Sequence, residues 1–117
     1  MEKDCVFCKI AKGEIKATFI FESDNFFAMN DANPRTRGHA LVIPKKHFVN
    51  MMDLPDTLGG ELIDTIKSVA SVLLNEKGVE GFNVFQNNFP AAGQAVMHAH
   101  FHILPRRKGD GIRLLVG

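Results

Sequence analysis

Tryptophan and tyrosine are absent from the 117-residue chain, so its ten phenylalanines supply all of its aromatic surface. Proteins that bind single-stranded nucleic acid stack bases on aromatic side chains along a basic groove. The 14 Lys and Arg residues nearly cancel the 13 Asp and Glu residues, which gives a formal net charge of +1 and no basic field. The composition therefore predicts no nucleic-acid partner.

Long apolar runs are missing as well. No stretch approaches the roughly 20 apolar residues that span a bilayer, and the opening Met-Glu-Lys-Asp-Cys leads into no apolar segment of a secretory signal. We therefore expect a cytoplasmic protein without a membrane partner. The length predicts a single domain over residues 1–117 with one modest core.

Cysteine is scarce, and both copies lie in one Cys-x-x-Cys pair, Cys5 and Cys8. In a reducing compartment this spacing is more typical of metal binding or redox chemistry than of a structural disulfide. The sequence by itself leaves both of these alternatives open.

The hydrophobic pattern predicts strands mixed with one long helix. Leu58, Leu62, Ile66, Val69 and Leu73 recur at three- and four-residue spacing, which is typical of an amphipathic helix. The predicted elements are a short helix over 5–12, strands over 17–22, 26–29 and 39–44, a long helix from Asp56 to Lys77 that Gly78 stops, strands over 81–86 and 95–104, and a loose polar tail over 106–110. No regular βαβ alternation is present, so the chain is predicted to be an α+β domain on an antiparallel sheet.

Three of the five histidines lie at alternate positions, His98, His100 and His102. If this segment is a strand, the three imidazoles share one face, and Ala99, Phe101 and Ile103 face the core beneath the helix. Neighbouring imidazoles repel when protonated, so neutral rings are favoured, and both nucleophilic catalysis and metal binding use neutral rings. A three-histidine zinc site and attack of one imidazole on phosphorus both fit. Because three ligands on one strand are crowded around one metal, we favour the attack on phosphorus.

The segment His98-Ala-His100-Phe-His102-Ile-Leu resembles the signature of the histidine triad (HIT) family, in which three histidines alternate with apolar residues. Cys-Val-Phe-Cys-Lys-Ile near the start, residues 30–47 in the middle and Gly93-Gln94 before the triad are similar to the Hint-like, bacterial and archaeal branch. The resemblance covers nearly the whole chain. It implies a HIT-like fold, with a five-stranded antiparallel sheet, one long helix and a short N-terminal helix.

This resemblance implies a nucleotidyl hydrolase or transferase that acts on a purine nucleotide of the AMP type. The substrate would be a nucleoside phosphoramidate, an acyl-nucleotide or a dinucleoside polyphosphate. By the match, His100 is the nucleophile that attacks the α-phosphate, and His102 and His39 orient the site, with His98 as the third member of the triad. The family also implies a homodimer in which two sheets meet edge to edge.

Further residues match the nucleotide contacts of the family. Asp31 resembles the carboxylate that accepts the ribose hydroxyls, although a turn-forming Asp is the plain alternative. Ala95 stands where Hint-type members often carry Ser or Thr, which puts in doubt the proton-transfer step or the leaving-group preference. Asn87, Gly93 and Gln94 resemble contacts to the phosphate and leaving group, and Val6, Phe7, Ile10 and Met29 fall where the family lines its base pocket, with ordinary core packing as the alternative.

The resemblance also implies a zinc site. Several members of this branch bind zinc through the cysteine pair, the histidine that ends Pro-Lys-Lys-His and the first histidine of the triad, which here are Cys5, Cys8, His47 and His98. Such a closed four-ligand site would be structural and would attach the N-terminal helix to the sheet. It would remove His98 from direct chemistry. Free buried thiols are the alternative.

Three functions therefore remain open. The first is a HIT nucleotidyl hydrolase. The second is a nucleotide-binding or partner-binding module with little turnover, which the alanine at position 95 keeps under consideration. The third is a zinc hydrolase with a catalytic, histidine-bound metal.

Overall fold

The computed structural model describes residues 4–114 and contains five strands and two α-helices in that range. In chain order the elements are α1 (Val6–Ala11), β1 (Phe19–Glu22), β2 (Phe26–Asn30), β3 (Ala40–Pro44), the 3-10 helix η1 (Asp56–Leu58), α2 (Gly59–Leu74), β4 (Val79–Phe85), the 3-10 helix η2 (Pro90–Ala92) and β5 (Phe101–Arg107). The predicted α+β class and the five-stranded antiparallel sheet are confirmed.

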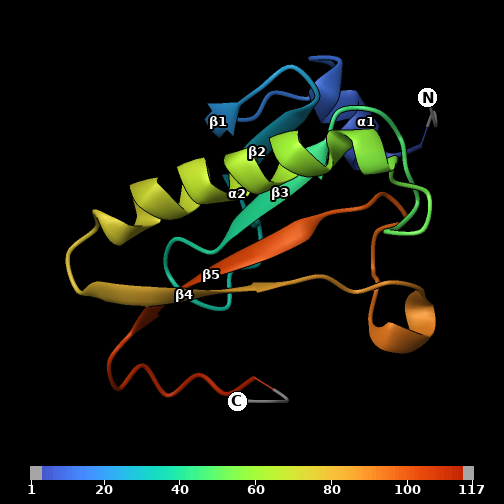
Figure 1. Ribbon diagram of the computed structural model, residues 1–117. Coiled ribbons are helices and arrows are strands. Elements are labelled where there is room, and N and C mark those ends of the chain that lie inside the picture. Colours follow the sequence, from blue (N-terminus) through green and yellow to red (C-terminus); the bar gives the residue numbers. More distant parts are fainter. Residues whose placement is uncertain (1–3, 115–117) are drawn as a thin grey trace.

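All neighbouring strands of the sheet are antiparallel, in the order β1-β2-β3-β5-β4. The long helix α2 crosses one face of the sheet, and the short helix α1 lies at the other face (Figure 1). The last strand, β5, lies between β3 and β4 and is therefore central, while β1 and β4 form the two edges. A site carried on β5 is consequently supported from both sides.

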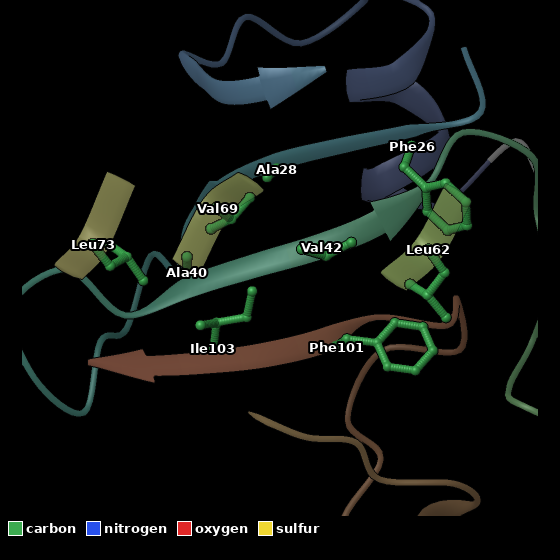
Figure 2. Close-up of a cluster of buried hydrophobic side chains, with 9 residues drawn as sticks. All are labelled: Phe26, Ala28, Ala40, Val42, Leu62, Val69, Leu73, Phe101 and Ile103. Atoms are coloured by element: carbon green, nitrogen blue, oxygen red, sulfur yellow. The ribbon is translucent and has the colours of Figure 1, made fainter. Parts of the chain in front are cut away.

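The larger core lies between α2 and the sheet. Leu62, Val69 and Leu73 of α2 are buried, as the helical spacing predicts. They pack on β2, β3 and β5, from which Phe101 and Ile103 point toward the helix as predicted (Figure 2). Figure 2 shows the whole cluster, which comprises Phe26, Ala28, Ala40, Val42, Leu62, Val69, Leu73, Phe101 and Ile103.

A second core cluster covers the opposite face. Phe7 and Ile10 of α1 pack on Phe27, Leu41 and Ile43 of the sheet. Successive side chains of a strand point to opposite faces of the sheet. Ala40 and Val42 of β3 belong to the first core cluster, so Leu41 between them belongs to the second. His102 pairs with Leu41 in the β3–β5 register and therefore lies on the α1 face.

Some predicted boundaries are wrong. The long helix ends at Leu74, with Asn75 as its C-cap, rather than at Lys77; Gly78 turns the chain at φ +84. Asp56, where the long helix was predicted to begin, lies within η1, and α2 begins at Gly59.

The polar tail is also ordered rather than loose. Arg106 belongs to β5, and its guanidinium pairs with Asp110 at 2.9 Å and donates to the side chain of Asn83. Among residues 4–114, no helix is long and apolar enough to cross a membrane.

Candidate active site and metal centre

The three histidines of the motif do not share one strand. The fifth strand begins at Phe101 rather than at residue 95, so His98 and His100 precede it and only His102 lies within it. The chain bends at residues 96–98, and the ladder to β3 starts where Phe101 pairs with Val42. His98 is fully buried, whereas His100 and His102 are partly exposed. The three rings therefore occupy different environments.

The proton of His100 is placed by the backbone. The carbonyl oxygen of His98 lies 2.7 Å from Nδ1 of His100. A carbonyl only accepts, so Nδ1 carries the hydrogen and donates it, and Nε2 keeps the free lone pair. The ring of Phe7 contacts His100 edge to face, with 5.3 Å between centroids. Nε2 is thus the nitrogen available for attack on an electrophile.

A second hydrogen-bonded pair, His39 and His102, lies beside it. The backbone N–H of Arg35 donates to Nδ1 of His39 at 3.1 Å, so the His39 proton is on Nε2. Nε2 of His39 then donates to Nδ1 of His102 at 3.0 Å, which places the His102 proton on its own Nε2. The ring of Phe85 stacks on His102 at 4.5 Å and 5°. The chain therefore fixes the tautomer of both rings.

Burial keeps this pair neutral. Desolvation, together with the neighbouring His100 and His39, lowers the pKa of His102 to about 4 against the opposing effect of Asp31. Desolvation also lowers the pKa of His39, partly offset by the Asp31 carboxylate. At neutral pH His102 therefore presents an N–H donor without a positive charge.

Asp31 makes the turn-forming contact that the sequence left open as the plain alternative for it. Oδ1 accepts the backbone N–H of Asn33 at 2.9 Å, which is a turn-forming contact. Oδ2 lies 3.6 Å from Nε2 of His39 and 4.0 Å from Nδ1 of His102. One oxygen holds the loop and the other faces the histidine pair.

The loop from Asn87 to Ala95 is braced from within. Nε2 of the buried Gln94 donates to the carbonyls of Val49 and Val96, and its Oε1 accepts the N–H of Phe89. The amides of Gly93 and Gln94 donate to the carbonyls of Pro90 and Phe89. Gln94 thus shapes the loop through backbone contacts.

Two residues of this loop have unusual backbone conformations. Gly93 adopts φ +95, and a Cβ there would lie 3.5 Å from Nδ2 of Asn87, which donates to the Gly93 carbonyl at 3.5 Å. Phe89 has φ 72 and ψ 150, a region populated almost only by glycine, with its side chain 55% exposed. Nothing in the sequence pattern signals this strained residue.

The predicted base-pocket residues separate into two groups. Phe7 and Ile10 are buried in the second core cluster, and Met29 packs against that cluster. This placement also agrees with the alternative of ordinary core packing. Val6 is exposed and lines a surface hollow together with Ala95 and His47.

The cysteine pair meets two histidines, as predicted. Sγ of Cys5 and Sγ of Cys8 lie 3.2 and 3.6 Å from Nδ1 of His98, and Sγ of Cys8 lies 3.3 Å from Nδ1 of His47. Tetrahedral zinc bonds of about 2.0–2.1 Å to nitrogen and 2.3 Å to sulfur separate the two ligand atoms by about 3.5 Å. The four donors lie within 4.8 Å of one another, and this cluster could hold a metal ion.

The ring orientation of His98 supports that fit. Its Nε2 lies 2.7 Å from the carbonyl oxygen of Pro44, so Nε2 carries the proton and the Nδ1 lone pair faces the two sulfurs. Desolvation, together with the nearby His47 and His100, lowers the pKa of His98 to about 4 against the opposing effect of the Pro44 carbonyl.

Asp31, His39 and His102 also place donor atoms within 4.8 Å of one another. At this second cluster, a backbone hydrogen bond opposes metal binding. The Arg35 N–H occupies Nδ1 of His39, so a metal at Nε2 would force a proton onto Nδ1 against another donor. The geometry favours metal binding at the cysteine cluster and proton placement at the Asp31 cluster.

The model of the HIT domain matches residues 12–109 of the chain. An uncharacterized HIT-like protein of Methanocaldococcus jannaschii is 46% identical over 109 residues, which cover 92% of this chain and 82% of that protein. The adenosine 5'-monophosphoramidase of Schizosaccharomyces pombe is 41% identical over 102 residues, covering 87% and 74%. The crystal structure of a zinc-bound histidine triad family protein from Mycobacterium smegmatis superposes with a TM-score of 0.88 at 38% identity, covering 95% and 81%.

Proposed function

The chain belongs to the HIT family, and from this premise we propose that it is a nucleotidyl hydrolase or transferase whose nucleophile is Nε2 of His100. The observation that carries this proposal is the 2.7 Å hydrogen bond from Nδ1 of His100 to the His98 carbonyl, which leaves Nε2 unprotonated. The substrate is a purine nucleotide of the AMP type bearing a leaving group on its α-phosphate. Similarity to an adenosine 5'-monophosphoramidase supports a phosphoramidate as the first substrate to test.

In this proposal the Nε2 lone pair forms a bond to the α-phosphorus while the bond to the leaving group breaks. The leaving group departs with that electron pair and takes a proton from water. The His100 ring becomes a cationic phosphoramidate, and its Nδ1–H bond to the His98 carbonyl strengthens as the charge develops. Water then attacks phosphorus and loses a proton to the solvent, while the N–P bond breaks and returns its electron pair to Nε2. The nucleotide leaves and the His100 ring is neutral again.

The neighbouring groups orient rather than react. Nε2–H of His102 can donate to a phosphate oxygen, because its Nδ1 is already occupied by His39. A neutral donor suits that role, since passing on its only ring proton would leave an anion. Asp31 keeps one carboxylate oxygen toward this pair, and we propose that it receives the ribose hydroxyls.

The test is a quenched reaction with adenosine phosphoramidate followed by intact mass analysis. We expect an AMP adduct on His100 that disappears in His100→Ala, while AMP binding survives in that variant. Turnover that persists in His100→Ala without an adduct would contradict the proposal. Activity lost on chelation and restored by zinc, with no adduct at any time, would favour a zinc hydrolase instead.

Ala95 favours one alternative, a nucleotide-binding module with little turnover. Its exposed side chain supplies no hydroxyl where many relatives of the Hint type have one. AMP binding without adduct or product in the quenched reaction would support this alternative.

We further propose that Cys5, Cys8, His47 and His98 hold a structural zinc ion. When bound, zinc would cross-link the start of α1 to His47, which follows β3, and to His98, which precedes β5. The zinc-bound relative of known structure supports this choice of metal. Reduced thiols as ligands fit the cytoplasm, where we propose that the protein works.

Finally, we propose a homodimer joined at the β4 edge. This edge strand leaves backbone groups unpaired within the described chain, and its Phe82 and Val84 are 40% and 44% exposed. Light scattering should give the mass of two chains, and Phe82→Lys should reduce it to one. The matched control Phe89→Lys, at another exposed phenylalanine outside the sheet, should stay dimeric; a monomeric parent protein would contradict the proposal.

A further inference from the structure

We propose that the metal cluster positions the nucleophile, through the His98 carbonyl and through the ring of Phe7, so that metal occupancy controls the rate at which His100 reacts. This inference rests on the proposed function, because it names what governs the same nucleophile. Phe7 and His98 act in it as positioning residues.

The first connection runs along the backbone. His98 supplies its Nδ1 to the cluster and its carbonyl oxygen to Nδ1–H of His100, at 2.7 Å. These residues precede β5, so ladder hydrogen bonds do not hold them. Ala99 between them donates to the carbonyl of Phe48 at 2.7 Å, next to the ligand His47. The cluster therefore joins the segment of His47 to the segment of His98. The contact between these two segments positions the His98 carbonyl, which accepts the proton of His100.

The second connection runs through Phe7, which lies between the two cysteines. Its ring is 6% exposed and meets two imidazoles edge to face, with centroids 5.6 Å from His98 at 83° and 5.3 Å from His100 at 64°. The cysteine turn fixes where α1 begins, since Sγ of Cys5 accepts the N–H of Cys8. A phenylalanine placed by this turn limits the rotation of the His100 ring.

Release of the cluster would loosen both restraints at once. The segment from His98 to His100 would keep its Ala99 hydrogen bond but lose the cross-link to Cys5 and Cys8. Misplacement of a reacting group by about 1 Å can cost roughly 100-fold in rate. We therefore expect adduct formation to slow about 10- to 100-fold when the metal is removed, whereas AMP affinity changes little.

The experiment compares zinc-loaded and chelated protein labelled with ¹⁵N-histidine. Long-range ¹H–¹⁵N spectra report the tautomer of His100 independently of any reaction, and rapid quench gives the single-turnover rate of adduct formation. Loaded protein should show a single Nδ1–H form of His100. Chelated protein should show a mixture of tautomers and the slower adduct.

Phe7→Leu separates positioning from metal binding. This variant should retain one equivalent of zinc, yet show shifted His100 nitrogen signals and slower adduct formation. Phe19→Leu is the matched control, because Phe19 packs against the same core cluster and stacks on Phe27 at 4.9 Å without contacting an imidazole. It should leave the His100 signals and the rate unchanged.

Identical His100 signals and rates with and without zinc would overturn the proposal, as would equal effects of Phe7→Leu and Phe19→Leu. If circular dichroism shows that chelation unfolds the protein, the comparison of zinc-loaded Phe7→Leu with zinc-loaded Phe19→Leu decides whether the cluster positions His100. A zinc-loaded protein that forms no adduct would defeat the proposed function, while the nitrogen signals would still test the positioning.

Discussion

Thermal stability should depend on free zinc through His98 and not through His39, although both histidines belong to clusters with suitable donor separations. A ligand that binds only the native state adds RT ln(1 + [L]/Kd), or about 1.4 kcal/mol per tenfold rise in free ligand above Kd. For a chain of 117 residues, an unfolding entropy of about 2.1 cal/mol/K per residue gives about 0.25 kcal/mol/K. Tm should therefore rise by about 5–6 °C for each tenfold increase in free zinc.

Scanning calorimetry in a zinc-buffered series over three decades measures this slope. His98→Asn removes the Nδ1 lone pair that faces both sulfurs, so its Tm should be nearly independent of zinc. His39→Asn should keep the parent slope, because the Arg35 N–H occupies the Nδ1 of His39 and its Nε2 carries a proton. A flat parent curve, or equal slopes in the two variants, would refute the assignment of the metal to the cysteine cluster.

Three further predictions concern the histidine pair, the C-terminal segment and the loop from Asn87 to Ala95. Burial lowers the pKa of His102 to about 4 and also lowers the pKa of His39 from its ordinary 6.5. Below pH 6.5 the unfolded chain therefore binds more protons than the folded chain. The free energy of unfolding should be greatest above pH 6.5 and fall as the pH drops toward 4; urea titrations should show a smaller fall in His102→Gln, and an equal fall would contradict this cause. Asp110→Ala should speed hydrogen exchange at the Ile112 amide, which donates to the Asp110 carboxylate at 3.0 Å, and unchanged exchange would argue against that restraint. Ala95→Ser should raise kcat with adenosine phosphoramidate roughly tenfold or more if proton transfer limits turnover, and an unchanged kcat would show that another step is limiting.

The parts of the fold that depend on short-range hydrophobic spacing could be predicted from the sequence. The spacing of Leu62, Val69 and Leu73 predicted α2 and the face it buries, because helical periodicity reflects burial directly. The start of β5 was predicted six residues too early. Residues 97–100 alternate an apolar residue with histidine, as a strand would, but the N–H of Ala99 bonds to the carbonyl of Phe48 in a loop rather than to a neighbouring strand.

The site shows the same division. The family resemblance predicted that the cysteine pair meets two histidines, and the structure brings those four donors together. The location of each proton could not be predicted, because it depends on groups far along the chain, the Pro44 carbonyl for His98 and the Arg35 amide for His39. The tail was predicted to be loose because Arg106 is polar, and its partner Asn83 is invisible to a local pattern.

The carbonyls that hold the protons of His98 and His100 belong to the main chain, at Pro44 and at His98 itself. Every amino acid supplies a carbonyl, so substitutions at those positions that keep the backbone path leave the acceptors in place. Side chains around the site, apart from the four cluster residues and Phe7, can therefore diverge over evolution while the proton placement on the His100 ring is inherited with the fold. In a directed-evolution library, changes of substrate preference should consequently be accessible without loss of the proposed nucleophile.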